Sequence, residues 1–193
     1  MAGTGKARQR LLDAAIERLA AEGLGELSLR QLAEALGTSH RMLIYHFGSK
    51  EGLLVEVVKA VEERQRAVFA DLVRGLEPGA SPTEIARHFW RRLTDPGMWP
   101  QERLFFELYG QALQGRPGTT GLLDGIVDSW VDPMSEWMVR HGVPEDMART
   151  EARLGLAVVR GLLLDLLATG DREAVDQAME RFLAAYPEDR HGR

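Results

Sequence analysis

The chain has 193 residues, no cysteine and a formal net charge of −5, with 45% hydrophobic and 27% charged residues. This composition and length are typical of a globular protein of one large or two small domains. The absence of cysteine excludes disulfides and thiolate metal sites. The N-terminus has no signal-peptide core, and the most apolar stretch, residues 154–168, is too short to span a bilayer and contains Arg160 and Asp165. We therefore expect a cytoplasmic protein with no membrane insertion.

Charge is distributed unevenly along the chain. Residues 1–50 hold seven basic and five acidic side chains, a net charge of +2, whereas the remainder holds 17 and 24, a net charge of −7. A mildly positive end on an acidic body is typical of a DNA-binding head joined to a domain that does not bind DNA.

Nearly every segment predicts a helix, and none alternates with the period of a strand. The first helix has apolar residues at helical spacing from Leu11 to Ala20 and stops at Gly23 and Gly25. Ser28 and Gln31 predict a capping box for a second helix that ends at Gly37. The start signals that follow are Thr38 or Ser39 for a third helix to about His46, and Ser49 for a fourth from Lys50 to about Arg74.

The second half of the chain predicts five more helices. Ser81-Pro82 opens the fifth, the sixth runs from Pro100 to about Gln114, and the seventh runs from Thr119 or Thr120 to about His141 with a bend or break at Pro133. The eighth runs from Pro144 to Ala168 and is closed by Gly170. Asp171 caps the ninth, whose apolar stripe is Val175, Ala178, Met179, Phe182 and Tyr186. Nine helices with short connections predict an all-α protein.

A helix-turn-helix is predicted by the second and third helices. Two helices that cross closely need a small residue at their contact, here Ala33, and a tight turn that favours positive φ, here Gly37. Leu43 supplies the apolar residue that closes the small core. An ordinary helical hairpin would explain Ala33 and the leucines but not the remaining residues of the pattern.

Residues 29–54 resemble the DNA-binding signature of the tetracycline-repressor (TetR) family. The matching residues are Leu32-Ala33, Gly37-Thr38-Ser39, Leu43, His46-Phe47, Ser49-Lys50-Glu51 and Leu53. The resemblance implies a ligand-responsive DNA-binding regulator, with a helix-turn-helix domain over residues 1–50, a ligand-binding and dimerisation domain over 51–186, and a flexible tail over 187–193.

DNA contacts are expected from the turn, the third helix and the starts of the second and fourth helices. Helix starts near Ser28 and Lys50 favour phosphate through their N–H groups, and Arg41 can pair with guanine O6 and N7 through two hydrogen bonds. The predicted DNA-binding residues are Ser28, Thr38, Ser39, His40, Arg41, Met42, Tyr45, His46 and Lys50, of which Arg41 is the expected base reader and His40 and Met42 are secondary candidates. His46 has a second interpretation, in which it packs under Phe47.

Two positions depart from the family pattern. The family usually has an aromatic residue where this chain has Ile44, with Tyr45 next to it, and often a small residue at the position of Arg41. The first change puts one habitual phosphate contact in question, and the second places a bidentate donor on the recognition helix.

A homodimer through the eighth and ninth helices, about residues 145–186, is expected. Between Leu154 and Ala168 the eighth helix has almost no polar face, so it must be buried on two sides. Gly155, Ala157 and Gly161 would allow close approach of a second subunit, and the resemblance implies the same pairing. A dimer spaces two recognition helices about 34–36 Å apart and predicts a palindromic operator. The alternative is a monomer with a central core helix.

Aromatic residues and methionines concentrate in residues 89–138. They form either a core or an apolar pocket, and the resemblance favours a cavity for a small apolar effector. The predicted lining is Trp90, Phe105, Phe106, Tyr109, Trp130, Met134 and Trp137, with Glu107, Gln111, Asp128 and His88 as polar candidates. The effector would be cationic if one of the acids is buried.

Catalytic and metal sites are not expected. The five histidines have no metal-ligand spacing on a common helix, and there is no nucleophile elbow or glycine-rich phosphate loop. We therefore predict no enzyme, no cofactor and no metal. A helical carrier or enzyme that only resembles a regulator is the competing class, and an activator or a corepressor-dependent repressor is the closer alternative.

Overall fold

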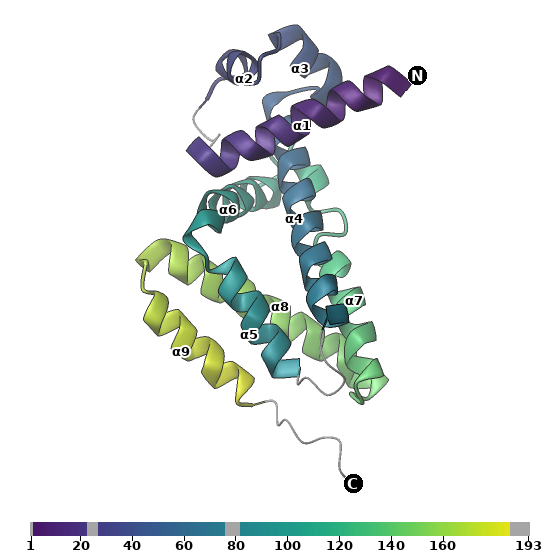
Figure 1. The fold of residues 1–193 in the computed structure, drawn as a ribbon, viewed down its shortest axis with the longest axis vertical. Coiled ribbons are helices and arrows are strands. Elements are labelled where there is room, and N and C mark those ends of the chain that lie inside the picture. Colours follow the sequence, from purple (N-terminus) through teal and green to yellow (C-terminus); the bar gives the residue numbers. More distant parts are fainter. Residues whose placement is uncertain (1, 23–26, 76–81, 186–193) are drawn as a thin grey trace. The chain divides into compact units, whose positions relative to one another are not determined.

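The computed structural model describes residues 2–22, 27–75 and 82–185. Over these ranges the chain forms nine α-helices and two short 3₁₀ helices and no strand, which confirms the predicted all-α class (Figure 1). In chain order they are α1 (Ala2–Glu22), α2 (Leu29–Ala35), α3 (His40–Phe47), α4 (Lys50–Gly75), α5 (Pro82–Leu93), η1 (Pro96–Met98), α6 (Trp99–Leu113), η2 (Thr120–Leu122), α7 (Asp128–Arg140), α8 (Glu145–Thr169) and α9 (Arg172–Leu183).

The chain packs as two compact units, each described by itself. The first contains the described residues up to Gln65 together with Gly97–Asp124, and the second contains Arg66–Pro96 and the described residues from Gly125 onward. The boundary predicted near residue 50 falls inside the first unit. The division into functional domains therefore stays a prediction that packing alone does not decide.

The first unit consists of α1, α2, α3, the first part of α4, α6 and η2. Its core is apolar, with Leu12, Leu43, Leu53, Leu108 and Leu122 all buried. α1 is held against α4 by two ion pairs, one between Arg8 and Glu56 and one between Arg64 Nη2 and Asp13 Oδ1 at 2.8 Å. The segment predicted to bind DNA therefore folds on a scaffold that includes α1, α4 and α6.

The second unit consists of the end of α4, α5, α7, α8 and α9. In Figure 1, α5 and α9 lie beside each other. Trp90 Nε1 on α5 donates to Asp176 Oδ1 on α9 at 2.6 Å, and Arg87 Nε donates to Glu180 at 3.0 Å. α7 packs on α8, where Asp132 and then Asp128 raise the pKa of Arg149 through a side-chain hydrogen bond and their negative charge.

Local end signals place the last two helices as predicted. Gly170 ends α8 with φ 72°, in the left-handed region that favours glycine, and its N–H donates to the carbonyl of Leu166 at 2.8 Å. Asp171 caps α9 by accepting from the N–H of Ala174 at 3.0 Å. Of the predicted α9 stripe, Val175 and Met179 are buried, Phe182 is half-buried and Ala178 is exposed. Ser81, Gly23, Gly25 and Tyr186 lie outside the described residues.

The predicted seventh helix was too long. Thr119 precedes only the short η2, its hydroxyl donates to the carbonyl of Arg116 at 2.8 Å, and α7 begins at Asp128. Gly125, at φ 68°, interrupts the segment before α7. Of the two alternatives expected at Pro133, the break was wrong, because α7 is continuous through it, and the bend stays a prediction. None of the helices in the described ranges is long and apolar enough to cross a membrane.

Candidate nucleic-acid interface

The turn between α2 and α3 has the backbone geometry that the sequence predicts. Gly37 adopts φ 63°, which a side-chain-bearing residue reaches only with strain. The N–H of Thr38 donates to the carbonyl of Ala33 at 2.9 Å, and the N–H of Gly37 donates to that of Glu34 at 3.1 Å. The requirement for glycine at this turn is therefore confirmed.

A small apolar core joins the two helices of the motif. Leu32 and Leu43 have no exposed surface, and Ala33 is 3% exposed where α2 and α3 pack together. Phe47, at the end of α3, is buried in the same unit. Burying this face of α3 fixes which side chains the helix presents to solvent.

Serine hydroxyls cap the starts of α2, α3 and α4. Ser28 and Gln31 form the predicted capping box, in which both the N–H and the hydroxyl of Ser28 donate to Gln31 Oε1, at 2.9 and 2.7 Å. Ser39, rather than Thr38, caps α3 by accepting from the N–H of Met42 at 3.2 Å. Ser49 accepts from the N–H of Gly52 at 2.9 Å.

These caps bear on the predicted phosphate contacts. The hydroxyl of Ser39 accepts a backbone hydrogen bond through one lone pair, so its proton remains available to a phosphate oxygen. Both donors of Ser28 end on Gln31, so a phosphate contact from Ser28 requires Gln31 to give up one of its hydrogen bonds.

The outer face of α3 is exposed and carries no acid. His40, Arg41, Met42, Ile44 and Tyr45 are all exposed, with Tyr45 at 69%. Residues 35–50 contain no Asp or Glu. Within the part of the chain that is described, no ion pair engages the Arg41 guanidinium. The face can therefore offer positive charge, hydroxyls and apolar contact to a polyanion without an internal competitor.

The remaining predicted contacts are half-buried. Thr38, His46 and Lys50 are each partly covered. The His46 ring meets Tyr45 edge-on at 5.0 Å and Phe47 at 6.1 Å between centroids, and its Nε2 is buried without a hydrogen bond. This geometry favours the packing interpretation of His46, because Nε2 must become accessible before it can reach a phosphate.

Arg8 is a contributor to this region that the sequence patterns did not identify. Its guanidinium lies 5.1 Å from the centre of the Phe47 ring and pairs with Glu56 on α4. It thus ties α1 to the junction of α3 and α4. No periodic pattern links residues 8, 47 and 56, so only the positive charge of Arg8 was visible in the sequence.

The predicted effector-binding side chains belong to two packed sets. In the first unit, Phe105 is buried and Phe106 and Tyr109 are half-buried, with the rings of Phe105 and Tyr109 stacked at 5.4 Å. In the second unit, Trp90, Trp130 and Trp137 are buried and Met134 is half-buried. The described surroundings of the second set include Phe89, 5.6 Å from Trp130, and His141, 4.4 Å from Trp137.

The predicted polar candidates are mostly engaged at the surface. Gln111 donates to Glu107 at 3.1 Å, and Arg149 donates to Asp128 at 2.7 Å. His88 is exposed and lines a pocket of about 360 Å³ at the end of α4, with Val68, Asp71, Leu72, Gly75 and Ile85.

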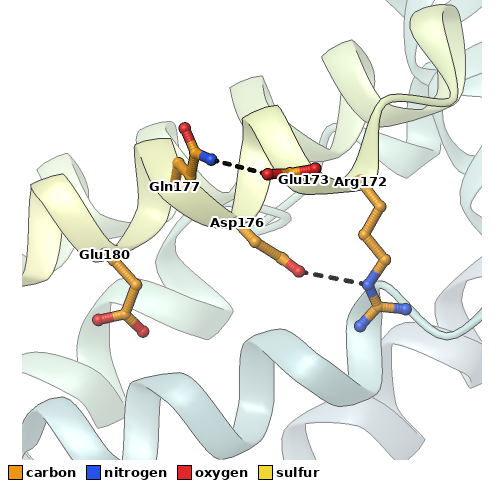
Figure 2. Close-up of a pocket in the computed structure, with 5 residues that line it drawn as sticks. All are labelled: Arg172, Glu173, Asp176, Gln177 and Glu180. Carbon is orange, nitrogen blue, oxygen red and sulfur yellow. Dashed lines mark hydrogen bonds and ion pairs between the residues drawn. The ribbon is translucent and has the colours of Figure 1, made fainter.

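A larger pocket, of about 620 Å³, lies along α9 (Figure 2). It is lined by Arg172, Glu173, Asp176, Gln177 and Glu180, none of which was predicted to bind an effector. Charged walls of this kind do not match a small apolar molecule. The aromatic effector site therefore stays a prediction. The described residues also contain no group of three or more His, Asp and Glu side chains that could hold a metal ion.

One side of α8 presents apolar side chains to solvent in the single chain. Leu154 is 48% and Leu164 is 51% exposed, and Ala157 and Gly161 between them are also exposed. These residues are spaced three and four apart and form one stripe along the helix. We call this set, Leu154, Ala157, Gly161 and Leu164, the α8 stripe.

Comparison with known proteins agrees with the geometry of the motif. Residues 11–57 match the bacterial regulatory proteins of the tetR family. The HTH-type transcriptional regulatory protein RaaS of Mycobacterium tuberculosis is 40% identical over 115 residues, which cover 46% of this chain and 52% of that protein. The aligned part thus spans about half the length of this relative.

Solved structures share the fold over nearly the whole chain. A transcriptional regulator from Rhodococcus sp. RHA1 has a TM-score of 0.71 at 21% identity, covering 92% of this chain and 94% of that one. A putative transcriptional regulator from Saccharomonospora viridis in complex with choline has a TM-score of 0.67 at 21% identity, covering 96% and 97%.

Proposed function

Because this chain belongs to the TetR family of bacterial regulatory proteins, we propose that it is a DNA-binding transcription repressor that a small molecule releases from a palindromic operator. The observation that carries the proposal is the exposed, acid-free face of α3, presented by a turn that requires glycine at Gly37. Such a face suits the major groove, where base edges and phosphates together reward positive charge and hydrogen-bond donors.

Arg41 is the proposed base reader. It is exposed near the start of α3, and a guanidinium can donate two parallel hydrogen bonds to guanine O6 and N7. His40 and Met42 are its secondary neighbours. Ser28, Thr38, Ser39, Tyr45 and Lys50 are the proposed contacts to the DNA backbone, whereas His46 is assigned to packing between Tyr45 and Phe47.

The proposed assembly is a homodimer through α8 and α9, about residues 145–186. The exposed α8 stripe supports it, because a monomer would leave two large leucine side chains in water on one helix face. A second copy of the chain would cover this face and place two recognition helices about one DNA turn apart, roughly 34–36 Å.

A small-molecule effector is proposed for residues 51–186. The choline complex of the Saccharomonospora viridis protein supports a ligand-binding role for this fold, and the aromatic residues that α5 and α7 bring together in the second unit support a largely apolar site. To weaken DNA binding, the effector must bind more tightly to the conformation that does not fit the operator.

The function is tested by first identifying the DNA site that the protein binds, and then measuring transcription of the adjacent gene in cells that contain or lack the protein. A repressor predicts higher transcription of the adjacent gene when the protein is absent. Loss of that transcription in its absence would instead identify an activator and overturn the proposed sign. A purified dimer that keeps its DNA affinity across a broad panel of metabolites and drugs would count against the effector.

A further inference from the structure

α1 contains two basic side chains, Lys6 and Arg10, that the helix-turn-helix does not explain. Both are exposed, and neither takes part in an ion pair within the described residues. They lie four residues apart and so share one face of the helix, about 6 Å apart along its axis. From their position we propose that Lys6 and Arg10 form an accessory contact to the phosphate backbone of DNA, beside the one made by α3. This inference rests on the proposed DNA-binding function.

The first supporting observation is the anchoring of this part of α1. Arg8, between the two cations, lies over the ring of Phe47 at 5.1 Å and pairs with Glu56. Phe47 is the last residue of α3, two positions after the exposed Tyr45. Residues 6–10 are therefore fixed beside the end of the recognition helix, where phosphates flanking the bound groove are expected.

The second observation is how the neighbouring acids are used. Glu56 is paired with Arg8, and Asp13 accepts from Arg64 at 2.8 Å and from Gln9 at 3.3 Å. These two acids are thus engaged by other partners, and the side chains of Lys6 and Arg10 face solvent. Each DNA strand carries one negative charge per about 3.4 Å of helix axis, so two cations about 6 Å apart can each meet a phosphate.

The third observation is a second ion pair between α1 and α4. Asp13, further along α1 than Arg8, pairs with Arg64 on α4. Together with the burial of Leu12 and Ile16 on α1, the two ion pairs hold the helix with Lys6 and Arg10 on its exposed side. Phosphate contacts from a fixed helix lose less side-chain and backbone freedom on binding than contacts from a mobile tail.

The test measures binding of the full-length protein to a labelled mixed-sequence DNA duplex as a function of salt concentration. The slope of log affinity against log salt is negative, and each lost phosphate contact reduces its magnitude by about 0.9. The magnitude of the slope should therefore fall by roughly 2 for each bound subunit in the double variant Lys6→Ala/Arg10→Ala, while Lys6→Arg, which keeps the charge, should retain the wild-type slope. Thermal unfolding should be unchanged, because both side chains are exposed.

A matched control removes two exposed arginines from the second unit, as Arg92→Ala/Arg140→Ala. It changes the net charge equally, so an equal loss of slope in both double variants would mean a general field effect and would overturn the contact. A wild-type slope in Lys6→Ala/Arg10→Ala would also overturn it, while leaving the proposed function intact. Absence of DNA binding by the wild-type protein would reject the proposed function itself, and the accessory contact with it.

Discussion

Gln65 on α4 donates a hydrogen bond from Nε2 to Glu102 Oε1 on α6 at 2.6 Å, and both side chains are buried. This is a polar link in the interior of the first unit, the same unit that contains the helix-turn-helix. Buried carboxylates are costly unless they are hydrogen-bonded, so the link constrains how α4 and α6 can pack. It joins the helix that follows the recognition helix to one that carries part of the predicted effector site.

Replacing Gln65 with leucine should destabilise the protein by about 1–3 kcal/mol, because the buried Glu102 carboxylate loses a hydrogen bond while the volume of the side chain at position 65 is largely kept. Urea unfolding followed by circular dichroism measures the change. Gln177→Leu is the matched control, since Gln177 makes the same type of bond to Glu173 at 3.2 Å on the exposed face of α9. A similar loss in both variants would mean that burial of the pair is not what matters.

Gly37→Ala should destabilise the protein by about 1–2 kcal/mol, because Gly37 adopts φ 63° in the left-handed region. Gly110→Ala, inside α6, should instead be neutral or stabilising by up to about 1 kcal/mol, because apart from its chain neighbours and the backbone of its own helix no atom lies within 4 Å of the added carbon. Thermal melting of the two variants compares them directly. Equal melting temperatures would contradict a strained turn at Gly37.

Arg41→Ala should relax base preference at one position of each half-site, at a cost of about 1–3 kcal/mol in binding to the preferred sequence. Selection of bound sequences from a random pool measures this preference. Lys50→Ala is the comparison, since a backbone contact should weaken binding to all sequences alike and lower the salt slope by about one. An unchanged sequence preference in Arg41→Ala would remove Arg41 from the base-reading role.

Leu164→Glu should convert the proposed dimer to a monomer, because it replaces one of the two exposed leucines of the α8 stripe with a charge. Sedimentation at micromolar concentration distinguishes the two states. Leu113→Glu controls for the charge itself, as Leu113 is even more exposed, at 65%, and lies on α6 outside the proposed interface. A dimer that survives Leu164→Glu would place the interface elsewhere.

Local signals were the part of the fold that could be predicted from the sequence. The capping box of Ser28 and Gln31, the positive φ of Gly37 and the end of α8 at Gly170 each depend on residues a few positions apart. The segment from Thr119 to Val127 was misassigned because its threonines also suit short turns, and Thr119 is used there to bond back to Arg116.

Long-range contacts could not be predicted. Arg8 meets Phe47 and Glu56, and Gln65 meets Glu102, across 37 to 48 positions of the chain with no periodic pattern to pair them. The same reason leaves the effector site a prediction. The aromatic residues of α5, α6 and α7 were visible as a composition, but their packing partners, such as Asp176 for Trp90, depend on the tertiary fold.

The central claim is that α3 reads DNA as one half of a symmetric pair. Selection of bound fragments from genomic DNA by the purified full-length protein tests it most directly. The account predicts enrichment of a palindromic sequence whose half-sites lie about one helical turn apart, roughly 10 base pairs from centre to centre. Recovery of fragments with no shared sequence would contradict it.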